Sequence, residues 1–389
     1  MSEMSYLEKL LDGVEVEWKT LGSIAELKRG TSITKKDVID GTIPVVAGGR
    51  TPAYYHNTSN RDGQTIVIAG SGAYAGFVSW WEEPIFVSDA FTVKPHNILL
   101  PRYCYHFLMN MQQQLHEFKS GGGVPHVYPR DVSPILIPIP CPNNPEKSLA
   151  IQSEIVRILD KFTALTAELT AELTARKKQY NYYRDRLLSF EEGEVEWKTL
   201  GEIAAYSKSR ISFDKLDENN YVGVDNLLQN RAGKMQSNYV PTSGNLTEFR
   251  EGDILIGNIR PYLKKIWQAD STGGTNGDVL VIRSCHESIL PRYLYQILAD
   301  ENFFEYNMQH AKGAKMPRGN KDAIMKYRLP IPSLNEQTRI VSVLDKFDTL
   351  TNSISEGLPR EIELRQKQYE YYRDLLFSFP KPETAHNTH

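Results

Sequence analysis

The chain contains one sequence plan written twice, and this duplication constrains its fold more than any other feature. The word EVEWKTLG occurs at residues 15–22 and again at 194–201. Further matched words follow in the same order in both halves: LPRY at 100–103 and 290–293, IPIP at 137–140 and LPIP at 329–332, ILDKF at 158–162 and VLDKF at 343–347, RKKQYNYYRDRLLSF at 176–190 and RQKQYEYYRDLLFSF at 365–379. Such long-period self-similarity predicts two copies of one structural unit.

Each repeat begins with a globular stretch and ends with a helical one. The globular stretches, 14–147 and 191–332, share the framework words and differ elsewhere, whereas the helical stretches, 148–190 and 333–379, are close copies. The segment YLEKLL at 6–11 also matches YRDRLL at 183–188, just before an EVEW word. We therefore expect a helical N-terminal tail at 1–13, a C-terminal tail at 380–389, and a circular arrangement with the two termini close together.

Both helical stretches carry apolar residues at steps of three and four, which is the pattern of one helix face. Asn144 followed by Pro145 is a typical helix start, and Ser333 with Glu336 has the spacing of a capping box. Gly357 and Pro359 are expected to kink the second helix near its middle. Long helices must bury their apolar stripes, so we expect the two to pair as an antiparallel coiled coil.

The globular stretches combine short β-like runs with short helices. Runs at 65–69, 85–87, 254–256 and 279–282 are separated by Gly, Asn and Ser clusters, and 101–111 and 291–299 have helical periodicity. This pattern predicts an α+β fold: two globular α/β domains joined by two long antiparallel helices and related by a pseudo-two-fold. Trp18 and Trp197 are equivalent in the repeat, and we interpret both as core anchors rather than ligand contacts.

Composition limits the location and the partners of the chain. It has no apolar run long enough to span a membrane, and its polar, acidic N-terminus is no secretory signal. Three scattered cysteines, Cys104, Cys141 and Cys285, favour a reducing cytoplasm. The net charge of −3 is unusual for a protein that binds DNA. However, residues 312–328 hold six basic residues and one acid, which indicates either a local nucleic-acid face or a solvated loop.

The chain lacks the motifs of enzymes that act on DNA. The Gly-rich AGSGAYAG at 69–76 has no acidic partner in the right context and is interpreted as a loop. No amino-methylation tetrapeptide and no P-loop occur. His96, His106, His116 and His126 lie ten apart without the spacing of metal ligands. We therefore expect neither catalysis nor a cofactor or metal in this chain.

The duplicated plan resembles the specificity (S) subunits of Type I restriction–modification systems, and the resemblance covers nearly the whole chain. The words that carry it are EVEWKTLGEIA at 194–204, IPIP and LPIP before the helices, IVRILDKFTALTAEL at 155–169, IVSVLDKFDTLT at 340–351 and NIRPYLKK at 258–265. The last of these is similar to sequence of target-recognition domains in this family. The helix words are most similar to the IC branch.

The resemblance implies a non-catalytic subunit that reads a bipartite, asymmetric site in double-stranded DNA with its two target-recognition domains. Its paired helices would space these domains and dock two methyltransferase (M) subunits, which restriction (R) subunits then join. S-adenosylmethionine, ATP and magnesium would belong to those partners. Two alternatives stay open: a fused methyltransferase–nuclease, and a coiled-coil adaptor that binds only protein.

Candidate DNA-reading residues follow from loop context and side-chain type. Arginine and lysine pair with guanine edges, and asparagine and glutamine pair with adenine. Contact with a phosphate, or plain surface exposure, stays open for each, since half or more of protein–DNA hydrogen bonds go to the backbone. The candidates are Lys35, Lys36, Arg50, Tyr74, His126 and Arg130 in the first domain, and Lys208, Arg210, Asn226, Arg260, Tyr262, Lys264, Lys315, Arg318 and Lys321 in the second.

A tandem tetrapeptide stands out in the first helical stretch. TAEL occurs at 166–169 and again at 170–173, yet the first stretch is four residues shorter than the second between its LDKF word and its Arg-x-Lys-Gln word. We expect the length of this segment to set the gap between the two DNA half-sites. A helix filler of no consequence is the alternative.

Overall fold

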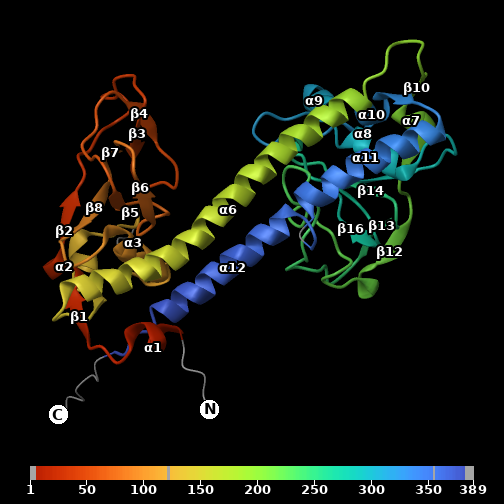
Figure 1. Cartoon of the computed structure of the whole chain (residues 1–389). Helices are drawn as coiled ribbons and strands as arrows, with labels where there is room; N and C mark the ends of the chain where they lie inside the picture. Colours follow the sequence, from red (N-terminus) through yellow and green to blue (C-terminus); the bar gives the residue numbers. More distant parts are fainter. Residues whose placement is uncertain (1–5, 121–122, 354, 382–389) are drawn as a thin grey trace, which may run out of the picture. The chain divides into compact units, whose positions relative to one another are not determined.

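The computed structural model describes residues 6–120, 123–353 and 355–381, so parts of the expected terminal tails lie outside the described residues. The chain divides into two compact units (Figure 1). Unit 1 comprises residues 1–166 and 364–389, and unit 2 comprises residues 167–363. The described residues after 364 thus belong to the same unit as those before 167, which confirms the circular order of the repeat.

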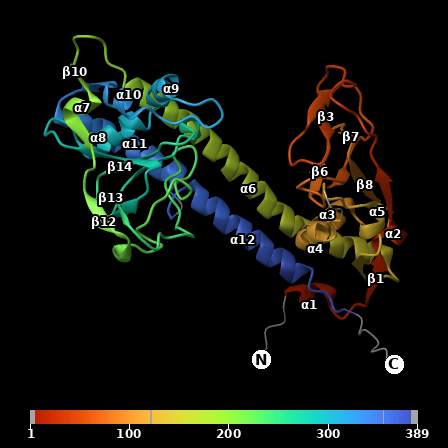
Figure 2. The same cartoon turned by 180° about the vertical axis from the view of Figure 1, so that it is seen from behind.

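Unit 1 is built on an antiparallel four-stranded sheet with strand order β2-β8-β5-β6. Its strands are β2 (Ala25–Arg29), β8 (Ala90–Pro95), β5 (Thr65–Ala69) and β6 (Val78–Trp81). Two smaller sheets accompany it: β4 (Tyr54–His56), β3 (Ile43–Val46) and β7 (Phe86–Val87), and the pair β1 (Val16–Thr20) with β9 (Leu136–Pro140). Figure 2 shows β3 and β7 side by side, and they pair in parallel.

Helices cover the core of unit 1. They are α1 (Tyr6–Leu11), α2 (Leu21–Ile24), α3 (Pro101–Asn110), α4 (Gln112–Glu117), α5 (Pro129–Val132) and parts of α6 (Pro145–Leu187) and α12 (Leu358–Leu376). Ile68 of β5, Tyr103 of α3 and Ile155 of α6 are fully buried in one cluster, which also holds Leu11 and Phe377 from the two ends of the chain. Trp18 packs against this cluster as expected, and its indole N–H donates to the Pro380 carbonyl at 2.7 Å.

Unit 2 repeats this architecture. Its main sheet has the order β11 (Ala204–Tyr206), β17 (Val279–Ser284), β14 (Ile254–Gly257) and β15 (Ile266–Gln268). A second sheet holds β12 (Arg210–Ser212), β13 (Asn245–Phe249) and β16 (Gly273–Thr275), and β10 (Glu196–Thr199) pairs with β18 (Arg328–Ile331). The helical elements are α7 (Leu200–Ile203), η1 (Phe213–Lys215), η2 (Pro261–Leu263), α8 (Pro291–Leu298), α9 (Glu301–His310), α10 (Lys321–Met325) and α11 (Leu334–Asn352). These mixed domains confirm the predicted α+β class.

The helix α6 spans 43 residues without interruption and passes from unit 1 into unit 2 between Thr166 and Ala167. Its start is capped as expected, because the Lys147 N–H donates to the Asn144 side chain at 3.0 Å. In unit 1, Phe162 of α6 stacks on Tyr372 of α12 with ring centroids 5.2 Å apart. In unit 2, Tyr183 of α6 stacks on Phe347 of α11 at 5.4 Å. The predicted pairing of the long helices is therefore confirmed within each unit.

The second helical stretch is interrupted rather than kinked, which corrects the expectation of one bent helix. The helix α11 ends at Asn352 and α12 begins at Leu358. A Cβ atom on Gly357 would lie 2.4 Å from the Thr349 carbonyl oxygen, so only glycine fits against the last turn of α11. Pro359 lies in the first turn of α12, where its missing N–H is not needed. None of the described helices is long and apolar enough to span a bilayer.

Candidate nucleic-acid interface

In unit 1, positively charged and aromatic side chains gather where the segment between α4 and α5 and the start of α5 meet the end of β2. The His126 and Tyr128 rings stack with centroids 5.7 Å apart and planes 14° from parallel. The Arg130 guanidinium lies 4.7 Å from the Tyr128 centroid, and Arg29 lies 5.5 Å from it. Flat rings and positive charges together suit contacts to bases and to phosphates.

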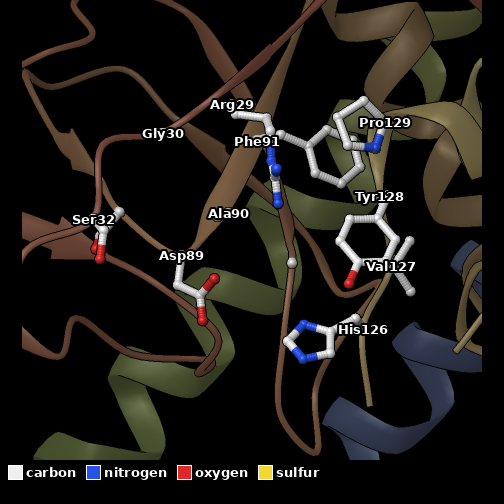
Figure 3. A pocket seen from close by; sticks show the side chains of 12 residues that line it. Arg29, Gly30, Ser32, Asp89, Ala90, Phe91, His126, Val127, Tyr128 and Pro129 are labelled. Atoms are coloured by element: carbon white, nitrogen blue, oxygen red, sulfur yellow. The ribbon is translucent and has the colours of Figure 1, made fainter. Parts of the chain in front are cut away.

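This cluster borders a cavity of about 370 Å³. Figure 3 shows the Arg29, Asp89 and His126 side chains around the same opening, with Ser32 at its edge. The Asp89 carboxylate accepts a short hydrogen bond from the Ser71 hydroxyl. The opening therefore presents both hydrogen-bond donors and an acceptor, as reading of base edges requires.

The remaining candidates of unit 1 lie outside this cavity. The Arg50 guanidinium covers the Tyr74 ring at 4.8 Å, and the ring is 41% exposed. Lys35 and Lys36 are exposed in a turn, which is closed by the Thr34 N–H donating to the Asp37 carboxylate at 3.1 Å. Among the first-domain candidates, only His126 lines the cavity, and Arg130 lies next to it over the Tyr128 ring.

In unit 2, the loop after β14 presents Arg260 and Tyr262 to solvent. Arg260 and Lys264 adopt left-handed backbone conformations with φ of 51° and 52° around the short helix η2. Tyr262 is 48% exposed at the tip. The Lys264 ammonium instead binds the Glu301 carboxylate, which also pairs with Arg231 at 2.7 Å. Lys264 therefore holds the loop to α9 in the unbound protein.

The basic segment that follows α9 carries Lys315, Arg318 and Lys321, all exposed. The Arg318 guanidinium donates to the Asp278 carboxylate at 2.8 Å, and its side chain remains 51% exposed. The pair stays accessible, so it is worth little to stability. Its geometry instead orients the guanidinium at the surface.

Three further candidates of unit 2 differ in accessibility. Lys208 and Arg210 are exposed, and Arg210 donates to the Thr247 hydroxyl at 3.0 Å. Asn226 is buried, and its side-chain oxygen accepts from the Gly223 N–H at 2.8 Å. Because its side chain is buried and bonded within this turn, Asn226 is the candidate that is least suited to contact a base.

Sequence reasoning missed Arg29, Tyr128, Asp89 and Asp278. Arg29 and Tyr128 join the cavity only because the chain folds β2 beside α5. Both acids lie directly before a core strand, Asp89 before β8 and Asp278 before β17. Alignment of these two strands in the repeat would have identified the two acids as equivalent positions.

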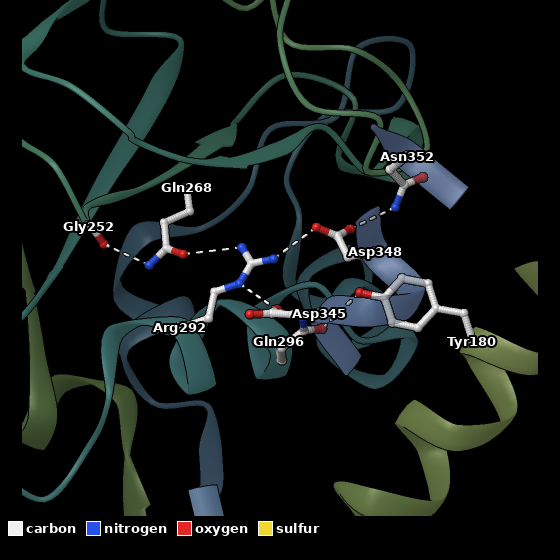
Figure 4. Close-up of polar contacts among 8 residues, drawn as sticks. All are labelled: Tyr180, Gly252, Gln268, Arg292, Gln296, Asp345, Asp348 and Asn352. Atoms are coloured by element: carbon white, nitrogen blue, oxygen red, sulfur yellow. Dashed lines mark hydrogen bonds and ion pairs between the residues drawn. The ribbon is translucent and has the colours of Figure 1, made fainter. Parts of the chain in front are cut away.

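A second polar network anchors the helices of unit 2 (Figure 4). Arg292 of α8 pairs with Asp345 at 2.7 Å and with Asp348 at 2.8 Å, both on α11. Gln296 donates to Asp345 at 3.1 Å and accepts from the Tyr180 hydroxyl of α6 at 3.1 Å. Burial raises the pKa of Tyr180 to about 12, so this hydroxyl keeps its proton.

Unit 1 contains the matching network with two exchanged residues, because His106 replaces Gln296 and Thr163 stands at the position of Asp348. Arg102 of α3 pairs with Asp160 of α6 at 2.8 Å. His106, at the position equivalent to Gln296, lies 2.7 Å from Asp160 through Nε2 and 2.9 Å from the Tyr369 hydroxyl through Nδ1. Burial lowers the pKa of His106, although its hydrogen bond to Asp160 opposes the shift. These buried polar bridges fix each sheet domain to its helices.

Two features of the described residues bear on metal binding and on nucleotide binding. No cluster of three His, Cys, Asp or Glu side chains suited to a metal ion occurs among them. The Gly-rich segment 69–76 connects the antiparallel strands β5 and β6. It does not lead from a strand into a helix, as a dinucleotide-binding loop does.

Comparison with known proteins identifies the family. Residues 13–176 and 192–364 both match the Type I restriction modification DNA specificity domain. The chain is 41% identical over its whole length to the whole specificity subunit of the Type I restriction enzyme EcoR124I/EcoR124II of Escherichia coli. It is 33% identical to the EcoprrI specificity subunit of Escherichia coli, with 92% of this chain and 93% of that one covered.

A solved structure shows the same fold. It is the crystal structure of a Type I restriction–modification system S subunit from M. genitalium, with a TM-score of 0.62 at 17% identity. The alignment covers 97% of this chain and 100% of that one. Repeat, fold and full-length similarity agree, and the chain belongs to the specificity subunits of Type I restriction–modification systems, the non-catalytic DNA-specificity component of these complexes.

Proposed function

We propose that the chain reads a bipartite, asymmetric site in double-stranded DNA, with one half-site contacted by each unit. The observation that carries this proposal is the pair of sheets with matching strand order, β2-β8-β5-β6 and β11-β17-β14-β15. The two sheets are framed by matched words, while the exposed cations around them differ. One framework with two different surfaces is what two different half-sites require.

The candidate contacts divide by chemistry. Base reading is proposed for His126 and Tyr128 at the cavity of unit 1, and for Arg318, Arg260 and Tyr262 in unit 2. The other exposed cations suit phosphate contacts, which position a protein on DNA without reading sequence. They are Lys35, Lys36, Arg50, Arg130, Lys208, Arg210, Lys315 and Lys321.

Two copies of one M subunit are the proposed partners of the long helices, and R subunits join that core. Matched tyrosines support this, because Tyr182 of α6 is 55% exposed and Tyr371 of α12 is 64% exposed. Exposed aromatic side chains are enriched at protein interfaces, and the same exposed word occurs twice. S-adenosylmethionine, ATP and magnesium would act in those partners, within the cytoplasm.

The test is to map methylated sites in DNA treated with the purified complex of this chain and its M subunit. A two-part motif with unlike halves and a fixed gap is expected. A gel shift of the same complex on the mapped site, against a site with one half scrambled, measures how much each half contributes. A protein-only adaptor would give no sequence-specific shift with or without the M subunit, and that result would refute the proposal.

A further inference from the structure

An antiparallel backbone bridge follows α4 in unit 1 and α9 in unit 2, and we call each bridge with its described neighbours the hairpin. In unit 2, Lys312 and Arg318 exchange two backbone hydrogen bonds of 2.9 and 2.8 Å. In unit 1, Ser120 and His126 exchange the same two bonds at 3.0 and 2.9 Å. His126 and Arg318 therefore end the same hairpin, and each follows a proline, Pro125 or Pro317.

The hairpin is fixed to the main sheet by matched bonds in both units. The Gly72 N–H donates to the Pro125 carbonyl at 3.0 Å, and the Arg260 N–H donates to the Pro317 carbonyl at 2.7 Å. Gly72 and Arg260 both have positive φ, 82° and 51°. After His126, the Val127 N–H donates to the Gly70 carbonyl in the loop after β5 at 3.0 Å. After Arg318, the Gly319 N–H donates to the Asn258 carbonyl in the loop after β14 at 3.1 Å. His126 and Arg318 thus occupy one structural position.

An aspartate accompanies this position in both units. The Asp89 carbonyl accepts from the Gly70 N–H at 3.1 Å, and the Asp278 carbonyl accepts from the Asn258 N–H at 2.8 Å. The Asp278 carboxylate holds the Arg318 guanidinium directly at 2.8 Å. In unit 1, the Asp89 carboxylate borders the same opening as the His126 ring (Figure 3).

The hairpin also exposes an apolar side chain two residues before His126 and two residues before Arg318. Val124 is 57% exposed and Met316 is 52% exposed. One exposed apolar residue is ordinary on a protein surface. Here the same hairpin position is exposed and apolar in both units, close to His126 or Arg318. Such a side chain suits contact with a base edge, because apolar side chains contact the thymine methyl group.

We infer that residues 126 and 318 are one specificity-determining position used twice, in which the side chain contacts a base edge, and that Asp278 acts as the positioning residue of Arg318. This inference rests on the proposed function. Arginine offers a planar fork that matches guanine O6 and N7, whereas histidine offers a single ring nitrogen as donor or acceptor. The two units therefore read different bases with one geometry.

The test uses the complex of this chain with its M subunit, and competition binding against DNA sites that carry every single-base substitution. Arg318→Ala should reduce discrimination at one base pair of one half-site by about 5- to 150-fold. His126→Arg should change the preferred base at one position of the other half-site. Each variant should leave the second half-site unchanged, and that half-site serves as the control for folding.

A matched control separates base reading from charge. Lys312→Gln removes one positive charge from the same hairpin and should weaken binding evenly across all sites, with a smaller salt dependence. Asp278→Asn should relax the same base pair as Arg318→Ala, and Asp278→Glu should restore part of the discrimination. A purely structural role of Asp278 would instead lower binding to every site equally.

The outcomes separate two failures. If Arg318→Ala weakens binding evenly, as Lys312→Gln does, residue 318 contacts phosphate and the inference is wrong. The inference also fails if His126→Arg leaves every base preference as it was. If the unmodified complex shows no base preference at any position, the proposed function fails before the inference is reached.

Discussion

His106 offers a sharp test of how each domain is held on its helices. In unit 1 it bridges Asp160 and Tyr369, and in unit 2 Gln296 makes the same bridge between Asp345 and Tyr180. The Gln296 amide N–H donates to the carboxylate and its carbonyl accepts from the hydroxyl. By analogy, neutral His106 donates from Nε2 and accepts at Nδ1. Glutamine should therefore replace His106, whereas leucine should not.

The expected magnitudes follow from the bonds that are lost. His106→Leu removes a hydrogen bond to a charged carboxylate, worth about 1.5–3 kcal/mol, and one to a neutral hydroxyl, worth about 1 kcal/mol. His106 is fully buried, whereas the Asp160 side chain is 38% exposed, so water can satisfy the carboxylate only in part. We expect a loss of about 2–4 kcal/mol in the stability of unit 1. His106→Gln keeps both bonds and should cost less than about 1 kcal/mol.

The pH dependence of stability has a definite sign. Burial lowers the pKa of His106 in the folded protein, and the nearby Arg102 and Arg373 guanidinium groups lower it further, against the opposing effect of Asp160. The neutral ring therefore contributes stability above the ordinary histidine pKa of about 6.5. This stability is lost as the pH falls from there toward the lowered folded value. Hydrogen bonds from His106 and Arg102 outweigh burial and lower the pKa of Asp160, so its contribution is lost only in stronger acid.

Hydrogen exchange of the full chain, followed by mass spectrometry at two pH values, measures both effects. Peptides from α3 and α12 report on unit 1, and peptides from α8 provide an internal reference in unit 2. In mildly acidic buffer, the unmodified chain should lose protection in α3, and His106→Gln should lose less. Equal loss of protection in the Gln and Leu variants, or an unchanged pH response in the Gln variant, would refute this assignment of the bridge.

Three further predictions concern the recognition of DNA and the assembly of the complex. A third TAEL inserted after Leu173 lengthens α6 by about 6 Å and turns it by about 40°. Methylation mapping should then show both half-sites unchanged and the gap between them longer by about one base pair. An identical gap would argue that the length of α6 does not set the gap. Replacing residues 14–147 with the first domain of another family member should change one half of the mapped site, and a change in both halves would contradict the two-reader arrangement. Lys177→Glu combined with Lys367→Glu should weaken co-purification with the M subunit while circular dichroism stays unchanged, and full assembly of this double variant would count against docking on the copied helix faces.

The elements with strong periodicity could be predicted from the sequence. The strand β5 has the predicted bounds, α1 lies within the expected helical tail 1–13, and α3 and α8 differ from the prediction by one residue at the C-terminal end. The start of α6 was signalled by its own capping residues. These features depend on neighbours in sequence, which local patterns record.

The cavity of unit 1 and the break in the second helix could not be predicted in the same way. Arg29 and Tyr128 are separated by most of the domain, and only the fold brings them together. The helix α11 ends at Asn352 because Gly357 packs against carbonyl groups of α11, a contact that a local pattern does not contain. The burial of Asn226 likewise depends on its turn, since asparagine is as common on loop surfaces as in turns.

The composition of unit 1 has a consequence for the order in which the chain folds during synthesis. Tyr369 bonds to His106, and Phe377 packs against Tyr103, so the core of unit 1 needs residues that follow unit 2 in the sequence. Residues 167–363 form unit 2 and leave the ribosome before those contacts exist. The domain that is translated first is therefore completed last. Until then its His106 and α3 surface stays open, and such transiently exposed apolar surface favours aggregation.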